Sequence, residues 1–163
     1  LRLRGYEYLR FVSDVYGVPE DIRATRATML VKRFGMEGAL ERQLLSYSHG
    51  MRQKMMVIGA LLPDPNVWIL DEPMVGLDPR AARTLKDSMR AHADAGRTVL
   101  FSTHVLDVAE RIVDRVGVIA QGELIFQGSV DDLHTRFSAD ESLEDMFLEL
   151  TEEDSPFRKV SAS

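Results

Sequence analysis

Apolar residues recur every three or four positions in the first third of the chain, which is typical of helices with one apolar face. Leu9, Val12 and Val15 mark a first helix, which the Gly17-Val18-Pro19 segment ends because proline cannot continue a helix. A weaker stripe predicts a second helix over residues 20–34, and glycines break the chain after it. The first third is therefore expected to be helical.

The remainder of the chain alternates short apolar runs with helical stripes. The runs Val67–Leu70 and Thr98–Phe101 predict two strands, and the first reads as a strand that is buried on both faces. The other expected elements are a hairpin turning at Gln121-Gly122 between strands 115–120 and 123–127, and helices over 50–62, 80–95, 105–113, from Ser129 onward, and over 141–150. This alternation predicts an α/β fold with a mostly parallel sheet.

Length and composition narrow the functional classes. The 163 residues suit one domain, and the net charge of −6 disfavours nucleic-acid binding, which normally uses a basic patch. The lack of cysteine excludes disulfides, thiolate metal sites and a cysteine nucleophile. The longest apolar run, Met55–Leu62, is much shorter than the roughly 20 residues of a membrane span.

Two adjacent carboxylates follow the first predicted strand. Asp71 and Glu72 stand at its C-terminal end, where open α/β sheets bind their ligands. One carboxylate of such a pair can hold Mg²⁺, which favours few carboxylates together with phosphate oxygens. The other can orient or deprotonate an attacking water, a role worth about 10²–10⁴-fold in rate. Taken alone, the pair fits an ordinary solvated strand end equally well.

Three further features extend this pattern. Ser48 and Gly50 open a predicted helix, whose N-terminal N–H groups suit a phosphate, although a plain N-cap by Ser48 is the simpler explanation. Asp78 can cap the next helix. His104 follows the second strand, so a parallel sheet would bring it to the same edge as Asp71.

In this order and spacing, these features resemble the ATP-binding cassette (ABC) ATPases over most of the chain. Asp71-Glu72-Pro73 is similar to the Walker B motif with its catalytic glutamate, and Tyr47–Met51 stands where the family signature, Leu-Ser-Gly-Gly-Gln, is expected. Gly76–Pro79 resembles the D-loop and His104 the switch histidine. The form of the signature and the ending Leu143–Leu150 are similar to cassettes of bacterial multidrug and polyketide-antibiotic exporters.

The resemblance implies a fold and a division of the chain. The fold is α/β, part of a P-loop NTPase with an ABC-type, RecA-like core and an α-helical subdomain at its N-terminal end. Residues 1–48 would form the α-helical subdomain and contact a membrane partner. Residues 49–137 would form the core portion, 138–150 a C-terminal helix and 151–163 a disordered tail.

The resemblance also implies a head-to-tail dimer of cassettes that encloses two ATP molecules. Ser48, His49 and Gly50 would contact the γ-phosphate of an ATP held mainly by the opposite subunit, and Asp78 would couple the two sites. His49 and Met51 replace the first glycine and the glutamine of the signature, whereas backbone donation at Gly50 would remain.

The remaining implied roles concern hydrolysis and location. Asp71 would support Mg²⁺, Glu72 would polarise the attacking water and His104 would sense the γ-phosphate. The implied partners are ATP, a second cassette and a transmembrane permease, with no nucleic acid. The protein would be cytoplasmic, held at the inner face of the cell membrane through the permease.

One element of such a cassette is missing from the sequence. A phosphate cradle of the Gly-x-x-x-x-Gly-Lys-Ser/Thr type, the Walker A motif, is absent because no lysine follows a glycine. The family's early glutamine loop is also absent, since the first glutamine is Gln43. We expect both before Leu1, so that these residues resemble the C-terminal two-thirds of a cassette. Alone, they are expected to hydrolyse little ATP and to be marginally folded or self-associating.

Two other functional classes remain open. The chain can be a non-catalytic interaction module, which supplies its signature face to a partner's ATP and needs Ser48 and Gly50 but not Glu72. It can also be a soluble ABC ATPase of translation or DNA repair. Such proteins typically carry tandem cassettes or long coiled coils, and the sequence shows no heptad run.

Overall fold

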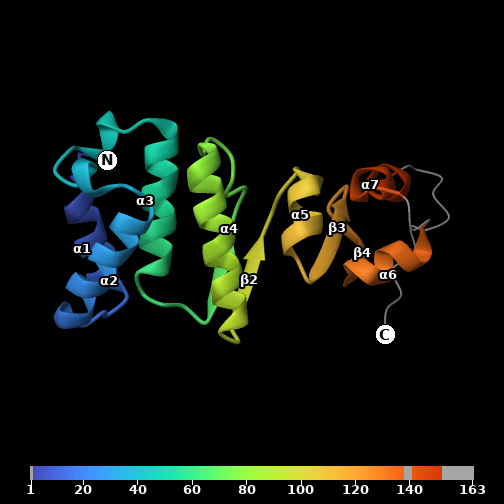
Figure 1. The fold of residues 1–163 in the computed structure, drawn as a ribbon, viewed down its shortest axis with the longest axis horizontal. Coiled ribbons are helices and arrows are strands. Elements are labelled where there is room, and N and C mark those ends of the chain that lie inside the picture. Colours follow the sequence, from blue (N-terminus) through green and yellow to red (C-terminus); the bar gives the residue numbers. More distant parts are fainter. Residues whose placement is uncertain (1, 138–140, 152–163) are drawn as a thin grey trace. The chain divides into compact units, whose positions relative to one another are not determined.

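The computed structural model describes residues 2–137 and 141–151 (Figure 1). The chain divides into two compact units, one ending at Thr103 and the other beginning at His104. The expected tail lies outside the described residues beyond Thr151, as do the first three residues of the expected segment 138–150.

Three helices form the N-terminal part of the first unit. They are α1 (Gly5–Val15), α2 (Glu20–Arg33) and α3 (His49–Leu61), with two short 3-10 turns at Glu37–Ala39 and Leu44–Ser46. Each helix buries apolar residues in a shared core, whose members include Leu9, Leu30, Phe34, Met55, Ile58 and Leu62. The helices expected from the apolar spacing are therefore confirmed, and burial of these residues stabilises them more than propensity does.

Two parallel strands and a long helix complete the first unit. Strands β1 (Val67–Leu70) and β2 (Thr98–Phe101) pair residue by residue from Val67 with Thr98 to Leu70 with Phe101. Helix α4 (Pro79–Asp94) connects them and buries Leu85 and Met89. Trp68 of β1 is 2% exposed, and its ring meets the ring of His92 of α4 edge-on, with the centroids 5.7 Å apart.

The opposite face of this small sheet is exposed. Val67 is 53% exposed, Ile69 68% and Leu100 60%. The expectation that β1 is buried on both faces is therefore wrong for this chain. The reason is that, among the described residues, β1 pairs with β2 alone and α4 shields only the face that carries Trp68.

The second unit is a hairpin with helices packed on it. It contains α5 (Leu106–Ile112), β3 (Arg115–Ala120), β4 (Glu123–Ser129), α6 (Val130–Arg136) and α7 (Leu143–Thr151). The predicted turn is confirmed: Gln121 and Gly122 both have positive φ, as the two-residue turn of a twisted hairpin requires. The core of the unit contains Ile125, Phe126, Leu133, Met146 and Leu150.

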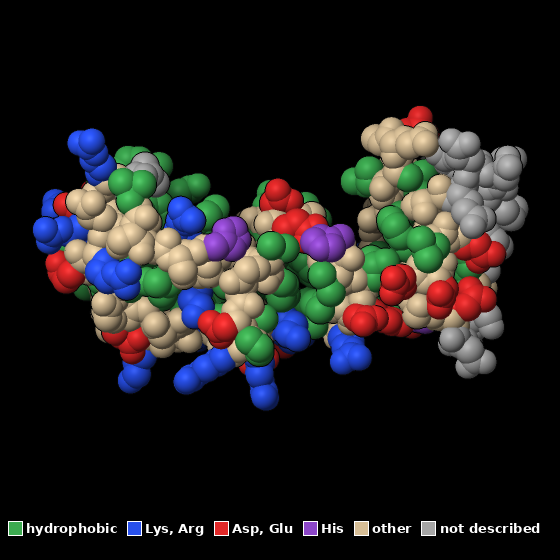
Figure 2. Space-filling view, turned by 90° about the horizontal axis from the view of Figure 1, so that it is seen from above, with side chains coloured by type: hydrophobic (Ala, Val, Ile, Leu, Met, Phe, Trp, Pro, Cys, Tyr) green, Lys and Arg blue, Asp and Glu red, His purple; other side chains and the backbone are tan. Residues whose placement is uncertain are grey.

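The two units differ in charge. Lys and Arg outnumber Asp and Glu before residue 104, and the acidic excess of the chain comes from the residues after it. In the space-filling view most of the Lys and Arg side chains belong to the first unit (Figure 2). Across residues 2–137 and 141–151, no helix has the combination of length and apolarity that crossing a membrane requires.

Candidate functional site

The first part of the candidate site is the N-terminus of α3. Ser48 has extended backbone angles, and its Oγ accepts a hydrogen bond from the Met51 N–H at 3.2 Å, so it is the N-cap. The first intrahelical hydrogen bond runs from the Arg52 N–H to the Ser48 carbonyl. The amides of His49 and Gly50 come before that bond and point out of the helix end, an arrangement that favours an anion.

The second part lies where the two parallel strands end. Ser102, which follows β2, donates from Oγ to Asp71 Oδ1 at 2.5 Å and accepts from the Glu72 N–H at 2.9 Å. Its own N–H donates to the Leu70 carbonyl at 3.0 Å. One serine thus fixes both carboxylate-bearing residues to the neighbouring strand. The sequence reasoning did not single out Ser102, although its place directly after a predicted strand was a usable signal.

The backbone of Glu72 has an unusual conformation. Its φ is +43°, in the left-handed region that residues with a side chain seldom occupy. Such conformations cost of order 1–3 kcal/mol and are found mainly at active sites and switches. The hydrogen bond from the Glu72 N–H to Ser102 and the bond from the Val75 N–H to the Glu72 carbonyl hold this turn in place.

The loop that follows Glu72 lies against α3. Gln53 Nε2 donates to the Pro73 carbonyl at 3.3 Å, and Lys54 Nζ is 2.8 Å from Asp78 Oδ2. Asp78 also caps α4, as the sequence predicted, because its Oδ1 accepts from the Ala81 N–H at 2.8 Å. The hydrogen bond from Lys54, together with that from the Ala81 amide, lowers the pKa of the Asp78 carboxyl.

Six of the seven site residues expected from the sequence belong to the first unit. They lie on two segments, the first turn of α3 and the loop from the end of β1 to the start of α4: Ser48, His49 and Gly50, and Asp71, Glu72 and Asp78. The two segments touch, since a Cβ added to Gly50 would lie 2.7 Å from the Gly76 carbonyl oxygen. The seventh residue, His104, is exposed and is the first residue of the second unit, just before α5. Its role stays a prediction.

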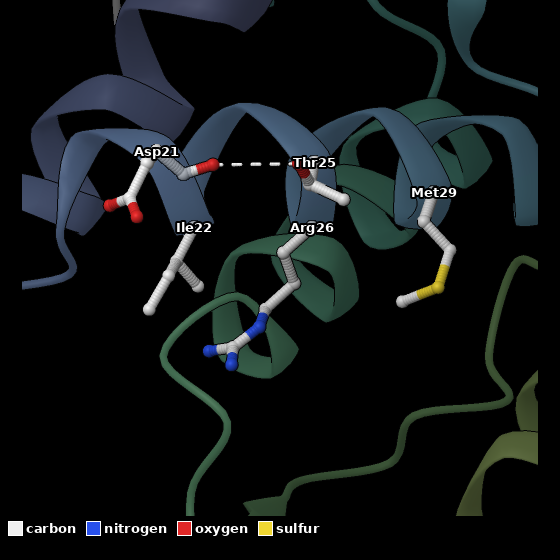
Figure 3. A pocket seen from close by; sticks show the side chains of 5 residues that line it. All are labelled: Asp21, Ile22, Thr25, Arg26 and Met29. Atoms are coloured by element: carbon white, nitrogen blue, oxygen red, sulfur yellow. Dashed lines mark hydrogen bonds between the residues drawn. The ribbon is translucent and has the colours of Figure 1, made fainter.

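A separate hollow lies along α2. It has a volume of about 440 Å³ and is lined by five residues of that helix, Asp21, Ile22, Thr25, Arg26 and Met29 (Figure 3). Arg26 donates to the Leu62 carbonyl at 3.0 Å, and so ties α2 to the end of α3. Ile22 is 41% exposed and Met29 51%, so the hollow is open to solvent, and it has both polar and apolar walls. None of the expected site residues lines it.

Comparison with known proteins identifies the family. A family model described as "AAA domain, putative AbiEii toxin, Type IV TA system" matches residues 7–106, more than half of the chain. A solved structure entitled "Structure of ATP binding subunit of ABC transporter" superimposes with a TM-score of 0.88 and 34% identity, over 92% of this chain and 63% of that one. The chain belongs to this AAA domain family and to the ATP-binding proteins of ABC transporters. The expected α/β fold, part of a P-loop NTPase, is thereby confirmed.

Curated relatives of the chain carry the same family description. "ABC-type transporter ATP-binding protein EcsA" of Bacillus subtilis is 38% identical over 91% of this chain and 60% of its own length. "Daunorubicin/doxorubicin resistance ATP-binding protein DrrA" of Streptomyces peucetius is 37% identical over 80% of this chain and 40% of its own length. The chain therefore spans between two-fifths and three-fifths of the length of these relatives.

Proposed function

We propose that these residues form the part of an ABC exporter's ATPase subunit that contains the hydrolytic carboxylates and the signature helix. The observation that carries the proposal is the contact between the two segments of the site. The Gly76 carbonyl abuts Gly50, and Ser102 fastens Asp71 and Glu72 at the other end of the same loop. The daunorubicin/doxorubicin resistance protein among the relatives supports export, and a permease would hold the subunit at the inner face of the membrane.

In this proposal the first turn of α3 binds the γ-phosphate of ATP that a second cassette presents. The helix dipole and the amides of His49 and Gly50 favour the charge of the phosphate. Ser48 both caps the helix and offers its hydroxyl group. His49, at the exposed start of the helix, would replace the small first residue of the signature with a ring that packs on Gly76.

Glu72 would orient and polarise the attacking water. Its left-handed backbone and the hydrogen bond from its N–H to Ser102 Oγ fix the position of the Glu72 Cα, from which the side chain extends. Phosphoryl transfer depends on such positioning. His104 would sense the γ-phosphate and Asp78 would couple the two sites of the dimer, both by resemblance to the family.

The residues present fit a magnesium ion that is held mostly by nucleotide and water. Among the described residues, no group of three His, Asp or Glu side chains could enclose a metal. Asp71 uses one carboxylate oxygen to accept from Ser102, which leaves the other for an ion. Mg²⁺ commonly binds through one or two carboxylates with phosphates and water, and it would neutralise charge on the phosphates.

The proposal is tested on the product of the complete reading frame, in which we expect a Gly-x-x-x-x-Gly-Lys-Ser/Thr loop before Leu1. Glu72→Gln should lower the kcat of Mg-ATP hydrolysis by about 10²–10⁴-fold, because the general base is lost while shape is kept. Glu37→Gln, at an exposed 3-10 turn, is the matched control and should leave kcat unchanged.

Unchanged turnover in the Glu72→Gln variant would contradict the catalytic role. The interaction-module alternative is then separated by complementation in cells. If Glu72→Ala supports export while substitutions of Ser48 and Gly50 abolish it, the chain acts through its signature face alone. Loss of export in all three variants supports the ATPase.

A further inference from the structure

The loop between Glu72 and α4 is attached to α3 at both ends and in the middle. At its start, Gln53 donates to the Pro73 carbonyl at 3.3 Å, and Pro73 is among the fully buried side chains. At its end, Lys54 pairs with Asp78 at 2.8 Å. Between these points the Gly76 carbonyl lies directly against Gly50. The loop therefore follows the surface of α3 rather than projecting freely.

The Lys54 pair is the charged one of these attachments. The lysine side chain is only 17% exposed, whereas the carboxylate of Asp78 is 53% exposed. Asp78 divides its two oxygens, because Oδ2 accepts from Lys54 and Oδ1 accepts from the Ala81 N–H that begins α4. A single carboxylate thus fastens the loop end to α3 and to α4 at once.

The middle contact leaves no space between helix and loop. A Cβ at Gly50 would stand 2.7 Å from the Gly76 carbonyl oxygen, closer than real Cβ atoms come. Gly76 has φ +78°, and a side chain there would collide with the ring of His49. Because the two backbones are in contact, movement of the first turn of α3 must displace the loop or break the Lys54 and Gln53 attachments.

We propose that Lys54 is a positioning residue, which holds the Pro73–Asp78 loop against α3 and so couples the first turn of that helix to the backbone of Glu72. Lys54 acts through Asp78 and touches no reacting group. When a partner's nucleotide contacts the start of α3, the loop would then shift the backbone of Glu72. The consequence for catalysis depends on the proposed function, whereas the attachment itself does not.

Amide hydrogen exchange on the complete protein tests the attachment. The Val75 and Leu77 amides report on the loop, since they donate to the Glu72 and Met74 carbonyls. Lys54→Met keeps length and helix propensity but removes the charge, and should accelerate exchange at both amides about two- to fivefold. Lys54→Arg should restore slow exchange. Arg52→Met, at an exposed position on the same helix, is the control and should leave the exchange rates of both amides unchanged.

A merely stabilising pair gives a different pattern. Exchange would then rise equally for the amides in the middle of α3, such as Ile58, and that uniform rise would overturn the proposal, as would no change at Val75 and Leu77. In the complete protein, Lys54→Met should lower kcat several-fold while the KM for ATP stays constant. If Glu72→Gln leaves turnover intact but the loop amides respond, the proposed function fails while the attachment stands.

Discussion

His92 is a buried titratable side chain beneath the sheet. It is 7% exposed, and its ring meets the ring of Trp68 edge-on. Burial, with the nearby Arg97 charge adding to it, lowers the pKa of His92, and Asp64 opposes the effect only in part. The folded chain therefore resists protonation at this site more than the unfolded chain does.

The first residue-scale prediction follows from that difference. Since the unfolded chain binds the proton at a higher pH, near 6.5, the free energy of unfolding should fall as pH decreases below about 6.5. His92→Gln, which replaces the titrating ring with a neutral polar side chain, should flatten this dependence of the free energy of unfolding between pH 7 and 5. Urea titrations followed by fluorescence of Trp68, the single tryptophan, measure it. If the free energy of unfolding depends on pH with the same slope in the wild type and in His92→Gln between pH 7 and 5, the assignment to His92 is wrong. Above pH 7.5 the difference in this free energy between the two proteins should be constant.

At the same scale, the sequence predicted the residues whose role is local. Ser48 and Asp78 were expected as N-caps because a cap bonds to an amide three residues ahead, and both do so. The Lys54 pair joins residues 24 positions apart, and Ser102 joins a strand end 31 positions away. No local pattern encodes such pairs, since they depend on how α3, β1 and β2 come together.

At the scale of the element, strands and helices could be predicted but the faces they bury could not. An apolar run such as Val67–Leu70 indicates a strand, and it is one. The run does not reveal how many neighbours will cover it. Trp68 and Ile69 are adjacent on β1 and point to opposite faces, so one is 2% exposed and the other 68%.

The element-scale prediction contrasts these two positions. Trp68→Ala should lower the free energy of unfolding by about 3–5 kcal/mol, because it empties a packed site against α4. Ile69→Thr keeps a β-branched residue on the exposed face and should change the free energy of unfolding by no more than about 0.5 kcal/mol. Ile69→Thr should also reduce any self-association of the 163-residue chain, measured by sedimentation. A large loss of stability from Ile69→Thr would show that this face is covered.

At the scale of the whole molecule, the proposed chemistry is divided between chains. Ser48 and Glu72 are linked within one chain through the loop, yet in a head-to-tail dimer each would serve a different ATP. Glu72 would act on the nucleotide bound by its own chain, and Ser48 on the nucleotide bound by the partner. Each complete site in the symmetric dimer would then need one residue from each subunit.

Mixing two inactive variants of the complete protein tests this division. In the Glu72→Gln homodimer both nucleotide sites lack the general base. In the Ser48→Arg homodimer both signature helices are blocked by the new side chain. A mixed dimer contains one damaged site and one intact site, formed by Glu72 of one subunit and Ser48 of the other. With equal mixing and independent sites, Mg-ATP turnover should recover to about a quarter of the wild-type rate, since half the dimers are mixed and each has one working site of two. Mixing each variant with itself is the control. No recovery, although mixed dimers are demonstrated by tag pull-down, would place both residues at the same subunit's nucleotide and contradict the head-to-tail arrangement.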